Sequence, residues 1–359
     1  MREIHLPTYR VGIAEGLLDS LGTLTAEAAP AHRYAVVTDA TVEGLYARRA
    51  LATFAPGTAQ LFVVPAGEPH KTRESWARLT DELLAAGFGR DTTVVALGGG
   101  VVGDLAGFVA ATFMRGVPYV QVPTTLLAMI DASIGGKTGV DTPAGKNLVG
   151  AFHQPAAVVV DPSTLATLPR EHLRAGLAEA LKHGIIADEP YFERTVDALP
   201  TLVGPAAGAA DRLADLIAHS VAIKADVVRR DEREGGVRKI LNFGHTLGHA
   251  IELLSGYSML HGEAVAVGMA LESELAERAG VAECGTLDRV RAALGAAELP
   301  AARPPAMRAD DILAATRLDK KARSGVVEYA LPRRIGAMAG EGGRWAVPVE
   351  DALVREVLA

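Results

Sequence analysis

The stretch TTVVALGGGVVGD, residues 92 to 104, decides the fold class of the N-terminal half. Its first six residues are apolar or β-branched and predict a buried strand. Gly98, Gly99 and Gly100 then predict a sharp turn, and the apolar residues that follow predict a helix starting at the strand end. Glycines let the backbone approach a phosphate group, and a helix N-terminus favours negative charge. The segment is therefore a candidate phosphate-binding turn, although its order is not GxGxxG and a plain strand-to-helix turn is the alternative.

The segments around this turn repeat the same alternation of strand and helix. Short apolar runs predict strands, while residues 41–54 and the apolar residues between Trp76 and Leu84 follow helical spacing. The predicted strands are 34–38, 61–64, 92–97, 117–122 and 157–160. This pattern predicts a Rossmann-like α/β domain over residues 1–166, with a parallel sheet that binds ligands at the carboxyl ends of its strands. Asp39 ends the first of these strands, where it could accept a ribose hydroxyl or simply cap the next helix.

The second half of the chain loses this rhythm. From about Pro169 onward the apolar residues recur at helical spacing, and the next strand-like run is 326–331. We place the boundary between 165 and 169, and we expect residues 167–359 to form a mainly α-helical domain that binds metal and substrate.

Composition excludes several classes of protein. Hydrophobic residues make up 49% of the 359 residues and charged residues 22%, which favours packed cores over disorder. The formal charge of −7 argues against nucleic acid as a partner, so any basic cluster must be local. Cys284 is the single cysteine, which excludes a disulfide framework and fits a reducing compartment. The N-terminus lacks the apolar core of a signal peptide, and glycines interrupt the longest apolar stretch, so we expect a cytoplasmic protein without a membrane span.

A cationic stretch follows the glycine turn. It contains Arg115, Asp131, the run GGKTG at 135–139 and the run GKN at 145–147. Glycines beside lysines allow backbone and charge to reach the same anion, whereas the alternative is a solvated loop. No GxxxxGK[ST] motif occurs, which argues against a P-loop nucleotide triphosphatase.

Candidate metal ligands occur in three helical segments of the second half. Glu179 has Lys182 at i+3, His245 and His249 share one helix face at i, i+4, and His261 stands at an expected helix start. Two histidines with one carboxylate and an open position form a catalytic zinc arrangement. Spacing alone leaves open which histidines bind, and an isolated buried histidine is usually a satisfied core residue.

Two further cations fall among apolar residues. Lys224 lies on the apolar stripe of a predicted helix, where it requires a buried partner or reaches outward to solvent. Arg238 precedes the run ILNFGH and allows the same two interpretations. Lys320 and Lys321 follow Asp319 and are surface residues by default.

Taken together, these segments resemble the 3-dehydroquinate synthase family of the sugar phosphate cyclase superfamily. The resemblance extends from about Asp39 to Lys321, and the order of its motifs makes it specific. The motifs are GGGVVGDLAGFVAATFMRG (98–116), VPTTLLAMIDASIGGKTGVD (122–141), GKNLVGAFHQP (145–155), GLAEALKHGII (176–186), DEREGG (231–236), LNFGHTLGHAIE (241–252), HGEAVAVGM (261–269) and LDKK (318–321). Asp141 and His183 depart from the family pattern, which has asparagine and tyrosine more often at these positions.

The resemblance implies a set of site residues. The family's metal ligands fall on Glu179, His245 and His261, which moves His249 to the substrate. Its substrate and catalytic residues fall on Arg115, Asp131, Lys137, Asn147, Lys182, Lys224, Arg238, Asn242, His249 and one of Lys320 or Lys321. Its NAD contacts fall on Asp39, Glu68, Lys71, Gly99, Gly100, Val101, Asp104, Thr124, Thr125, Lys146 and Thr167.

The resemblance also implies the chemistry. The expected cofactors are NAD and Zn²⁺, or Co²⁺, and the expected assembly is a homodimer. The implied substrate is 3-deoxy-D-arabino-heptulosonate 7-phosphate, which loses phosphate after transient oxidation and closes to 3-dehydroquinate by an aldol step after re-reduction. The alternatives are another sugar phosphate cyclase, a metal-dependent polyol dehydrogenase that forms net NADH, and a non-catalytic binding protein.

Overall fold

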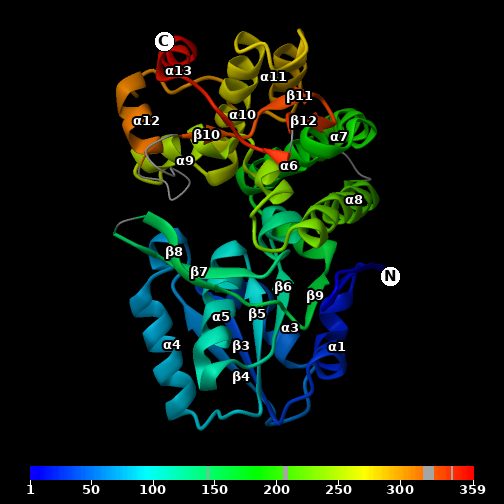
Figure 1. Cartoon of the computed structure of the whole chain (residues 1–359). Coiled ribbons are helices and arrows are strands. Elements are labelled where there is room, and N and C mark those ends of the chain that lie inside the picture. The colour runs from blue at the N-terminus through cyan, green and yellow to red at the C-terminus, as the bar shows by residue number, and fades with distance from the viewer. Residues whose placement is uncertain (144, 205–208, 318–326, 341–342) are drawn as a thin grey trace. The chain divides into compact units, whose positions relative to one another are not determined.

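A computed structural model of the chain describes residues 1–143, 145–204, 209–317, 327–340 and 343–359. The chain divides into two compact units, Met1–Leu168 and Pro169–Ala359, called unit 1 and unit 2 below (Figure 1). Unit 1 is an α/β domain and unit 2 is rich in helices, which confirms the predicted fold class.

Unit 1 is built on one seven-stranded sheet. Its strands are β1 (Arg2–His5), β2 (Arg10–Ile13), β3 (Arg33–Asp39), β4 (Ala59–Val64), β5 (Thr92–Gly98), β6 (Tyr119–Pro123) and β9 (Ala157–Val160). They lie in the order β1-β2-β9-β6-β5-β3-β4, and all neighbouring pairs are parallel except β1 with β2. The five predicted strands are confirmed. The two N-terminal strands were missed: each has only four residues, which is too short for a clear periodic signal, and the side chains of β1 are mostly exposed.

Helices cover both faces of this sheet. Its buried strands alternate, so that Val94 packs with α4 (Arg73–Ala85) and α5 (Gly100–Thr112), while Val95 packs with the opposite cluster. That second cluster includes residues of α1 (Leu21–Ala28) and of the helical segment formed by α2 (Ala40–Val42), η2 (Glu43–Ala47) and α3 (Arg48–Leu51). Short helical turns complete unit 1: η1 (Leu17–Ser20), η3 (Glu68–His70), η4 (Phe113–Arg115), η5 (Ala128–Ala132) and η6 (Pro162–Thr167).

The two Gly-Lys runs of the cationic stretch do not form the solvated loop that the sequence left as an alternative. Lys137 and Lys146 of these runs lie on an antiparallel two-stranded ribbon of β7 (Lys137–Thr142) and β8 (Gly145–Phe152). Val140 of β7 is fully buried in the core beside α5, whereas β8 is largely exposed. The sequence pattern did not predict this ribbon, because it is rich in glycine and because β8 buries almost no apolar face.

Unit 2 is mainly helical. Its helices are α6 (Arg170–Ala187), α7 (Glu189–Leu202), α8 (Ala209–Arg230), η7 (Val237–Asn242), α9 (His245–Leu254), α10 (His261–Arg278), α11 (Thr286–Ala296), α12 (Ala309–Thr316) and α13 (Asp351–Leu358). Short strands accompany them: β10 (Glu328–Tyr329), β11 (Pro332–Arg334), β12 (Ala337–Met338) and β13 (Val347–Pro348). α6 and α10 are buried along most of their length, which makes them the central helices of this unit.

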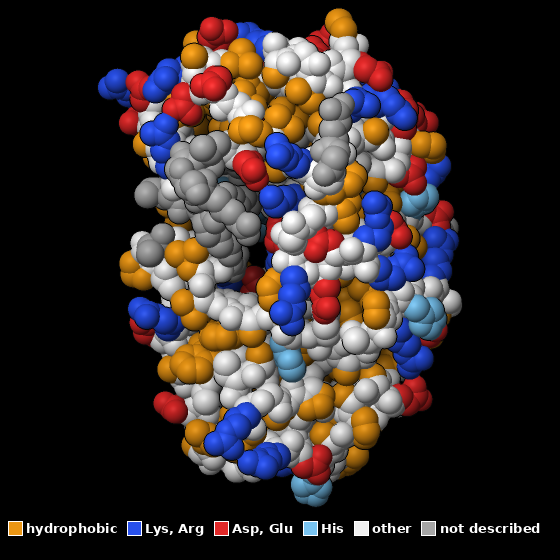
Figure 2. All heavy atoms as spheres, in the orientation of Figure 1, with side chains coloured by type: hydrophobic (Ala, Val, Ile, Leu, Met, Phe, Trp, Pro, Cys, Tyr) orange, Lys and Arg blue, Asp and Glu red, His pale blue; other side chains and the backbone are white. Residues whose placement is uncertain are grey.

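Two surface properties bear on partners. None of the helices in the described parts of the chain is long and apolar enough to cross a membrane. On the face seen in Figure 2, Lys and Arg side chains are intermixed with Asp and Glu side chains.

Candidate functional site

In unit 1 the glycine turn sits at the carboxyl end of β5. Gly98 ends the strand, Gly99 precedes α5, and no side chain caps this helix start. A Cβ on Gly98 would lie 2.7 Å from a methyl carbon of Val102, so this close turn tolerates only glycine there. The first-turn N–H groups, which include that of Val101, are therefore available to an anion.

Strands next to β5 bring further predicted NAD contacts to the same edge of the sheet. Asp39 ends β3, and its Oδ1 accepts hydrogen bonds from the N–H groups of Thr41 and Val42, so it does cap the following helix. Thr124 and Thr125 follow β6, and the Thr124 N–H donates to the carbonyl of Gly98. The sheet order places these residues side by side, as the parallel topology predicts.

A buried lysine organises the polar residues near this edge. Lys71 is 3% exposed, and its Nζ lies 2.8 Å from Glu68, 3.3 Å from Asp104 and 3.6 Å from Asp141. Lys146 of β8 contacts the same oxygen of Glu68 at 3.2 Å. We call these five residues the Lys71 cluster; it holds three carboxylates and two ammonium groups.

The charges of the Lys71 cluster shift one another's pKa values. Burial raises the pKa of Asp104 to about 6, although Lys71 acts in the opposite direction. Burial also disfavours the charged form of Glu68, but Lys71 and Lys146 outweigh it and lower the pKa of Glu68 to about 2. At neutral pH the cluster thus carries a local excess of negative charge, which suits hydroxyl groups better than phosphate.

The ribbon presents the predicted substrate residues of unit 1 toward solvent. Lys137 is exposed at the start of β7, and Asn147 is exposed on β8 with a left-handed backbone (φ 54°). The Asn147 N–H donates to Asp141 at 2.9 Å within the ribbon, and the Asp141 N–H donates to the Lys71 carbonyl at 2.7 Å, which ties the ribbon to the Lys71 cluster. Asp141 was not among the predicted contacts, and its role here is to support Asn147 and Lys71.

The remaining predicted residues of unit 1 lie in turns. Arg115 is exposed, again with a left-handed backbone (φ 69°), and Asp131 lies partly buried in η5. The Thr167 hydroxyl is 2.6 Å from the Tyr46 hydroxyl, which fixes η6 against η2.

In unit 2 three helices bring Glu179, His245 and His261 together. Glu179 of α6 has no exposed surface, and its Oε1 lies 3.5 Å from His245 Nε2 and 3.6 Å from His261 Nε2. His249 lies one helical turn beyond His245 on α9, and its ring centroid is 5.1 Å from that of His245. The nitrogens of His245, His249 and His261 form a group that could hold a metal ion. Geometry therefore gathers all four side chains that the sequence nominated.

Neighbouring groups orient the imidazole rings for metal binding. His245 Nδ1 lies 3.0 Å from the Phe243 carbonyl and must donate to it, which leaves the Nε2 lone pair facing Glu179. His261 Nδ1 lies 3.3 Å from Glu252, so a buried carboxylate holds this ring in the same manner. Such hydrogen bonds are the usual support of metal-binding histidines. The donor set fits a divalent metal such as Zn²⁺.

The protonation states of the two rings differ. Burial lowers the pKa of His245 well below its usual value, and Lys182 adds to this effect. Burial acts on His261 in the same direction, but hydrogen bonds to Glu179 and Glu252 outweigh it and raise the pKa of His261 to about 9. Without a metal, His261 is therefore protonated at neutral pH, which shows that the carboxylates of Glu179 and Glu252 favour a positive charge at this position.

Three predicted substrate cations of unit 2 are buried. Lys182, Lys224 and Arg238 are 1%, 6% and 1% exposed. Lys182 forms a very short ion pair with Glu179. Because a buried charge needs compensation, the interpretation of Lys224 and Arg238 as solvent-reaching residues is wrong.

A tight loop supports Arg238 and Asn242. Asp231 accepts hydrogen bonds from the N–H groups of Gly235, Gly236 and Arg238. Although burial opposes the change, these donors lower the pKa of Asp231 below its usual value. The Asn242 amide donates to Glu234 at 2.7 Å. Lys320 and Lys321, the last predicted substrate residues, lie outside the described residues.

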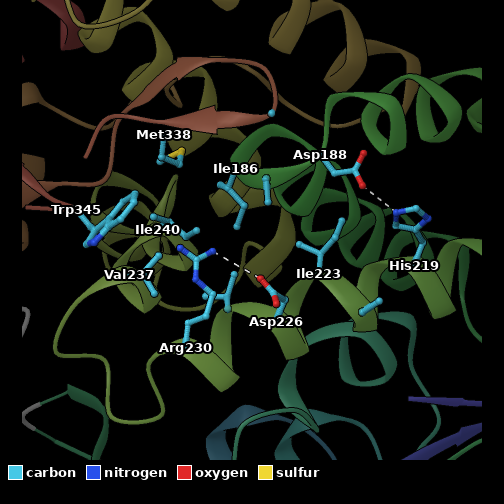
Figure 3. A pocket seen from close by; sticks show the side chains of 14 residues that line it. Ile186, Asp188, His219, Ile223, Asp226, Arg230, Val237, Ile240, Met338 and Trp345 are labelled. Atoms are coloured by element: carbon cyan, nitrogen blue, oxygen red, sulfur yellow. Dashed lines mark hydrogen bonds and ion pairs between the residues drawn. The ribbon is translucent and has the colours of Figure 1, made fainter. Parts of the chain in front are cut away.

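A separate cavity of about 440 Å³ lies within unit 2 (Figure 3). Apolar side chains of α6, α8 and η7 line it together with Met338 and Trp345, and His219 is paired with Asp188 at its margin. It contains none of the predicted site residues and does not contribute to the proposed chemistry.

Sequence reasoning missed the acidic residues that support the histidines. Glu252 lies in the quoted run LNFGHTLGHAIE, seven residues after His245, yet an acidic residue on a helix is usually exposed. Glu272 lies in the middle of α10 with no exposed surface. Their only signal in the sequence is that each is surrounded by apolar residues.

Comparisons with known proteins agree on one family. Family models described as 3-dehydroquinate synthase N-terminal and 3-dehydroquinate synthase C-terminal match residues 61–175 and 176–322. A 3-dehydroquinate synthase of Symbiobacterium thermophilum is 48% identical, covering 93% of this chain and 94% of the relative. One of Pelobacter propionicus is 44% identical, with coverages of 92% and 91%.

Solved structures of related cyclases share the fold. 2-Deoxy-scyllo-inosose synthase, solved with carbaglucose-6-phosphate, NAD⁺ and Co²⁺, aligns with a TM-score of 0.90 at 26% identity over 99% of both chains. 2-Epi-5-epi-valiolone synthase from Streptomyces hygroscopicus, solved with NAD⁺ and Zn²⁺, aligns with a TM-score of 0.87 at 32% identity, covering 100% of this chain and 98% of the other. A probable glycerol dehydrogenase from Sinorhizobium meliloti shares only the fold, at 17% identity, a TM-score of 0.68 and coverages of 100% and 97%.

Proposed function

The chain belongs to the 3-dehydroquinate synthase family, and we propose that it converts 3-deoxy-D-arabino-heptulosonate 7-phosphate to 3-dehydroquinate and phosphate. The observation that carries this proposal is the buried Glu179 carboxylate facing the Nε2 atoms of His245 and His261, with Lys182 beside it. A metal-ligand set adjoining buried cations suits an anionic substrate whose hydroxyl group must be activated.

The metal-binding residues in this proposal are Glu179, His245 and His261. A bound Zn²⁺ or Co²⁺ supplies a Lewis acid that lowers the pKa of a substrate hydroxyl group. His249 then offers its imidazole to the substrate instead of the metal. The Glu179 carboxylate lies 3.5 Å from His245 Nε2 and 3.6 Å from His261 Nε2, which supports these three residues as ligands, and the family pattern suggests the different role of His249.

Unit 2 also supplies buried cations for the substrate. Lys182, Lys224 and Arg238 are held in place by packing, so they lose little freedom when they bind a carboxylate or a phosphate group. Asn242 is fixed by Glu234 and can offer its amide oxygen to a hydroxyl group. Lys320 or Lys321 is the further cation that the family pattern suggests.

Unit 1 provides the residues for the dinucleotide. NAD supplies a hydride acceptor that is regenerated within each turnover, so no net NADH forms. The uncapped N-terminus of α5, with Gly99, Gly100 and Val101, binds the pyrophosphate. The carboxylates of Asp39, Glu68 and Asp104 are placed for hydroxyl groups, while Thr124, Thr125, Lys146 and Thr167 complete the contacts.

The other predicted residues of unit 1 have a different role. In this proposal the substrate contacts Lys137 and Asn147 of the ribbon, Asp131 in η5 and Arg115 in η4, which are the positions that the family pattern implies. We further propose that the enzyme acts as a cytoplasmic homodimer. The free Cys284 suits a reducing compartment, and light scattering of the purified protein tests the assembly.

One assay tests the reaction. Purified protein with NAD and Zn²⁺ should release phosphate from the heptulosonate phosphate without net accumulation of NADH. Accumulating NADH would indicate a polyol dehydrogenase, and release only from a different phosphorylated sugar would indicate another cyclase.

A matched pair of variants tests the role of the lysines. The sequence has eight lysines, and seven of them are predicted site residues, so Lys239 is the natural control. Lys137→Ala should lose about 1.5–3 kcal/mol of transition-state binding, or about 10- to 100-fold in kcat/KM, because one charge-assisted contact is removed. Lys239→Ala, which breaks only the ion pair with Glu328, should retain the activity. Equal phosphate release by both variants would remove Lys137 from the site.

A further inference from the structure

Glu272 is a buried carboxylate to which the proposed function assigns no role. It lies in the middle of α10, has no exposed surface, and uses both carboxylate oxygens within unit 2. Its Oε2 accepts a hydrogen bond from the Gly244 N–H at 2.7 Å, and its Oε1 accepts one from the Leu247 N–H at 3.0 Å. A glutamate in the middle of one helix therefore binds the start of another helix, α9.

The two N–H groups are ones that α9 cannot satisfy itself. Helix starts leave their first N–H groups without intrahelical partners, and a nearby side chain usually caps them. At α9 the capping position is Gly244, which has a left-handed backbone (φ 76°) and no side chain to serve as a cap. Glu272 fills that role from a neighbouring helix, and its negative charge also suits the helix N-terminus.

The segment that Glu272 holds includes the support of His245. His245 is the first residue of α9, and its Nδ1 donates to the carbonyl of Phe243. Phe243 directly precedes Gly244, and His245 directly follows it. A shift of the Gly244 N–H would therefore move both the ring and the carbonyl that orients it.

The same pair of helices carries both proposed histidine ligands. α10 begins at His261, and at two glycines the backbones of α9 and α10 approach too closely to admit a side chain. A Cβ on Gly268 would lie 1.9 Å from the Gly244 carbonyl oxygen, and a Cβ on Gly248 would lie 2.9 Å from that of Ala264. Glu272 lies one helical turn beyond Gly268, so it secures this close contact with two hydrogen bonds.

We propose that Glu272 is a positioning residue that sets the separation of His245 and His261 and thereby the affinity of the metal site. The inference rests on the proposed function, because it takes both histidines as ligands. Metal sites require their ligands within a few tenths of an ångström, so a small shift between α9 and α10 has a large effect.

The two oxygens of Glu272 explain why other residues cannot replace it. Glutamine has the same length, but its NH₂ group would face one of the two N–H donors and leave that buried group unsatisfied. Aspartate keeps both acceptors and the charge but is one methylene shorter, so α9 must move toward α10 to keep the hydrogen bonds. Both variants should therefore change the metal site, and aspartate should change it less.

The test measures binding of Co²⁺ alone to the full chain, without NAD or substrate. Glu272→Gln should weaken Co²⁺ binding by about 10- to 100-fold, as loss of a supporting hydrogen bond does in other metal sites, and should alter the visible spectrum of bound Co²⁺. Glu274→Gln is the matched control, because Glu274 lies on the same helix and pairs with Arg278 and Arg291 at the surface. NAD affinity should remain that of the wild type in both variants.

Three outcomes decide the matter. Wild-type Co²⁺ affinity and spectrum in Glu272→Gln, with only a lower unfolding temperature, would mean a purely structural role and would overturn the inference. If Glu272→Gln does not fold, Glu272→Asp takes its place, and wild-type Co²⁺ affinity and spectrum there would overturn the inference equally. His261→Ala separates this from the proposed function: unchanged Co²⁺ binding in that variant refutes the metal assignment itself.

Discussion

The two units prepare for anionic ligands in opposite ways. In unit 1 the anion-binding groups are backbone N–H groups at the uncapped start of α5, while the charged side chains of the Lys71 cluster satisfy one another. In unit 2 the proposed anion-binding groups are the buried side chains of Lys182, Lys224 and Arg238, and Lys182 pairs with Glu179 of the metal site. The site in unit 1 binds an anion through backbone N–H groups, and the site in unit 2 binds one through charged side chains.

This difference matches the ligands proposed for each unit. A pyrophosphate bound by backbone dipoles requires no counter-ion from the protein, and the excess carboxylates of unit 1 remain for ribose hydroxyl groups. A substrate with a phosphate and a carboxylate group requires full positive charges, and unit 2 contains them as the buried side chains of Lys182, Lys224 and Arg238. Loss of one buried side chain should therefore damage the metal site of unit 2 chemically and the Lys71 cluster of unit 1 structurally.

The largest expected effect is that of His261→Ala in unit 2. Removing one of three ligands should release the metal and lower turnover by about 10³-fold or more, because the metal accounts for several kcal/mol of transition-state stabilisation. Bound metal, measured by elemental analysis, and phosphate release should fall together. NAD binding should not change, since its residues lie in unit 1. Full metal occupancy in this variant would reject the triad of Glu179, His245 and His261.

A smaller, structural effect is expected from Lys71→Met in unit 1. The change leaves Glu68, Asp104 and Asp141 close together without their shared cation, which should reduce the free energy of unfolding by about 3 kcal/mol. This value is at the lower end of the usual cost of breaking a buried ion pair, because Lys146 still pairs with Glu68.

Tryptophan fluorescence can assign that loss to one unit. The sequence has two tryptophans, and Trp76 lies in unit 1 whereas Trp345 lies in unit 2. In a Trp345→Phe background, denaturation followed through Trp76 reports on unit 1. If Lys71→Met left the unfolding of unit 1 unchanged and lost metal binding instead, the effect would be chemical and not structural, contrary to the prediction for unit 1.

The same contrast explains what the sequence could predict. The site of unit 1 is visible because it depends on glycines at the end of an apolar strand, and both features are local in sequence. His261 stands at a helix start as predicted, and His245 and His249 lie on one helix. However, their assembly with Glu179 spans residues 179 to 261. The residue types nominated all four side chains, but only the family resemblance selected His245 and His261 over His249 as ligands.

Contacts between helices could not be predicted from the sequence. Glu252 and Glu272 look like ordinary surface residues in a helical sequence, and their burial depends on how α9 and α10 pack. The ribbon of β7 and β8 was missed for a related reason, since β8 exposes most of its residues and gains its order from pairing with β7. Local patterns thus predict elements and glycine turns, whereas long-range contacts decide which polar residues support them.

The smallest predicted effect concerns the pH dependence of unit 1. Folding raises the pKa of Asp104 from 3.8 to about 6, so the folded state binds this proton more tightly than the unfolded state. The resulting stabilisation is present at low pH and is lost as the pH rises through about 6. Between pH 7 and pH 5 it should amount to about 1 kcal/mol in favour of the acidic side. Glu68, whose pKa falls to about 2, contributes in the opposite sense only below about pH 4.5 and leaves this window unaffected.

Asp104→Asn cannot titrate and is the control. The unfolding free energy, followed through Trp76, is measured at pH 5 and at pH 7 in both proteins. The gain in unfolding free energy from pH 7 to pH 5 should be larger in the parent than in this variant. The same pH dependence in both proteins would show that Asp104 stays ionised, and that Lys71 compensates its carboxylates more completely than their burial opposes them.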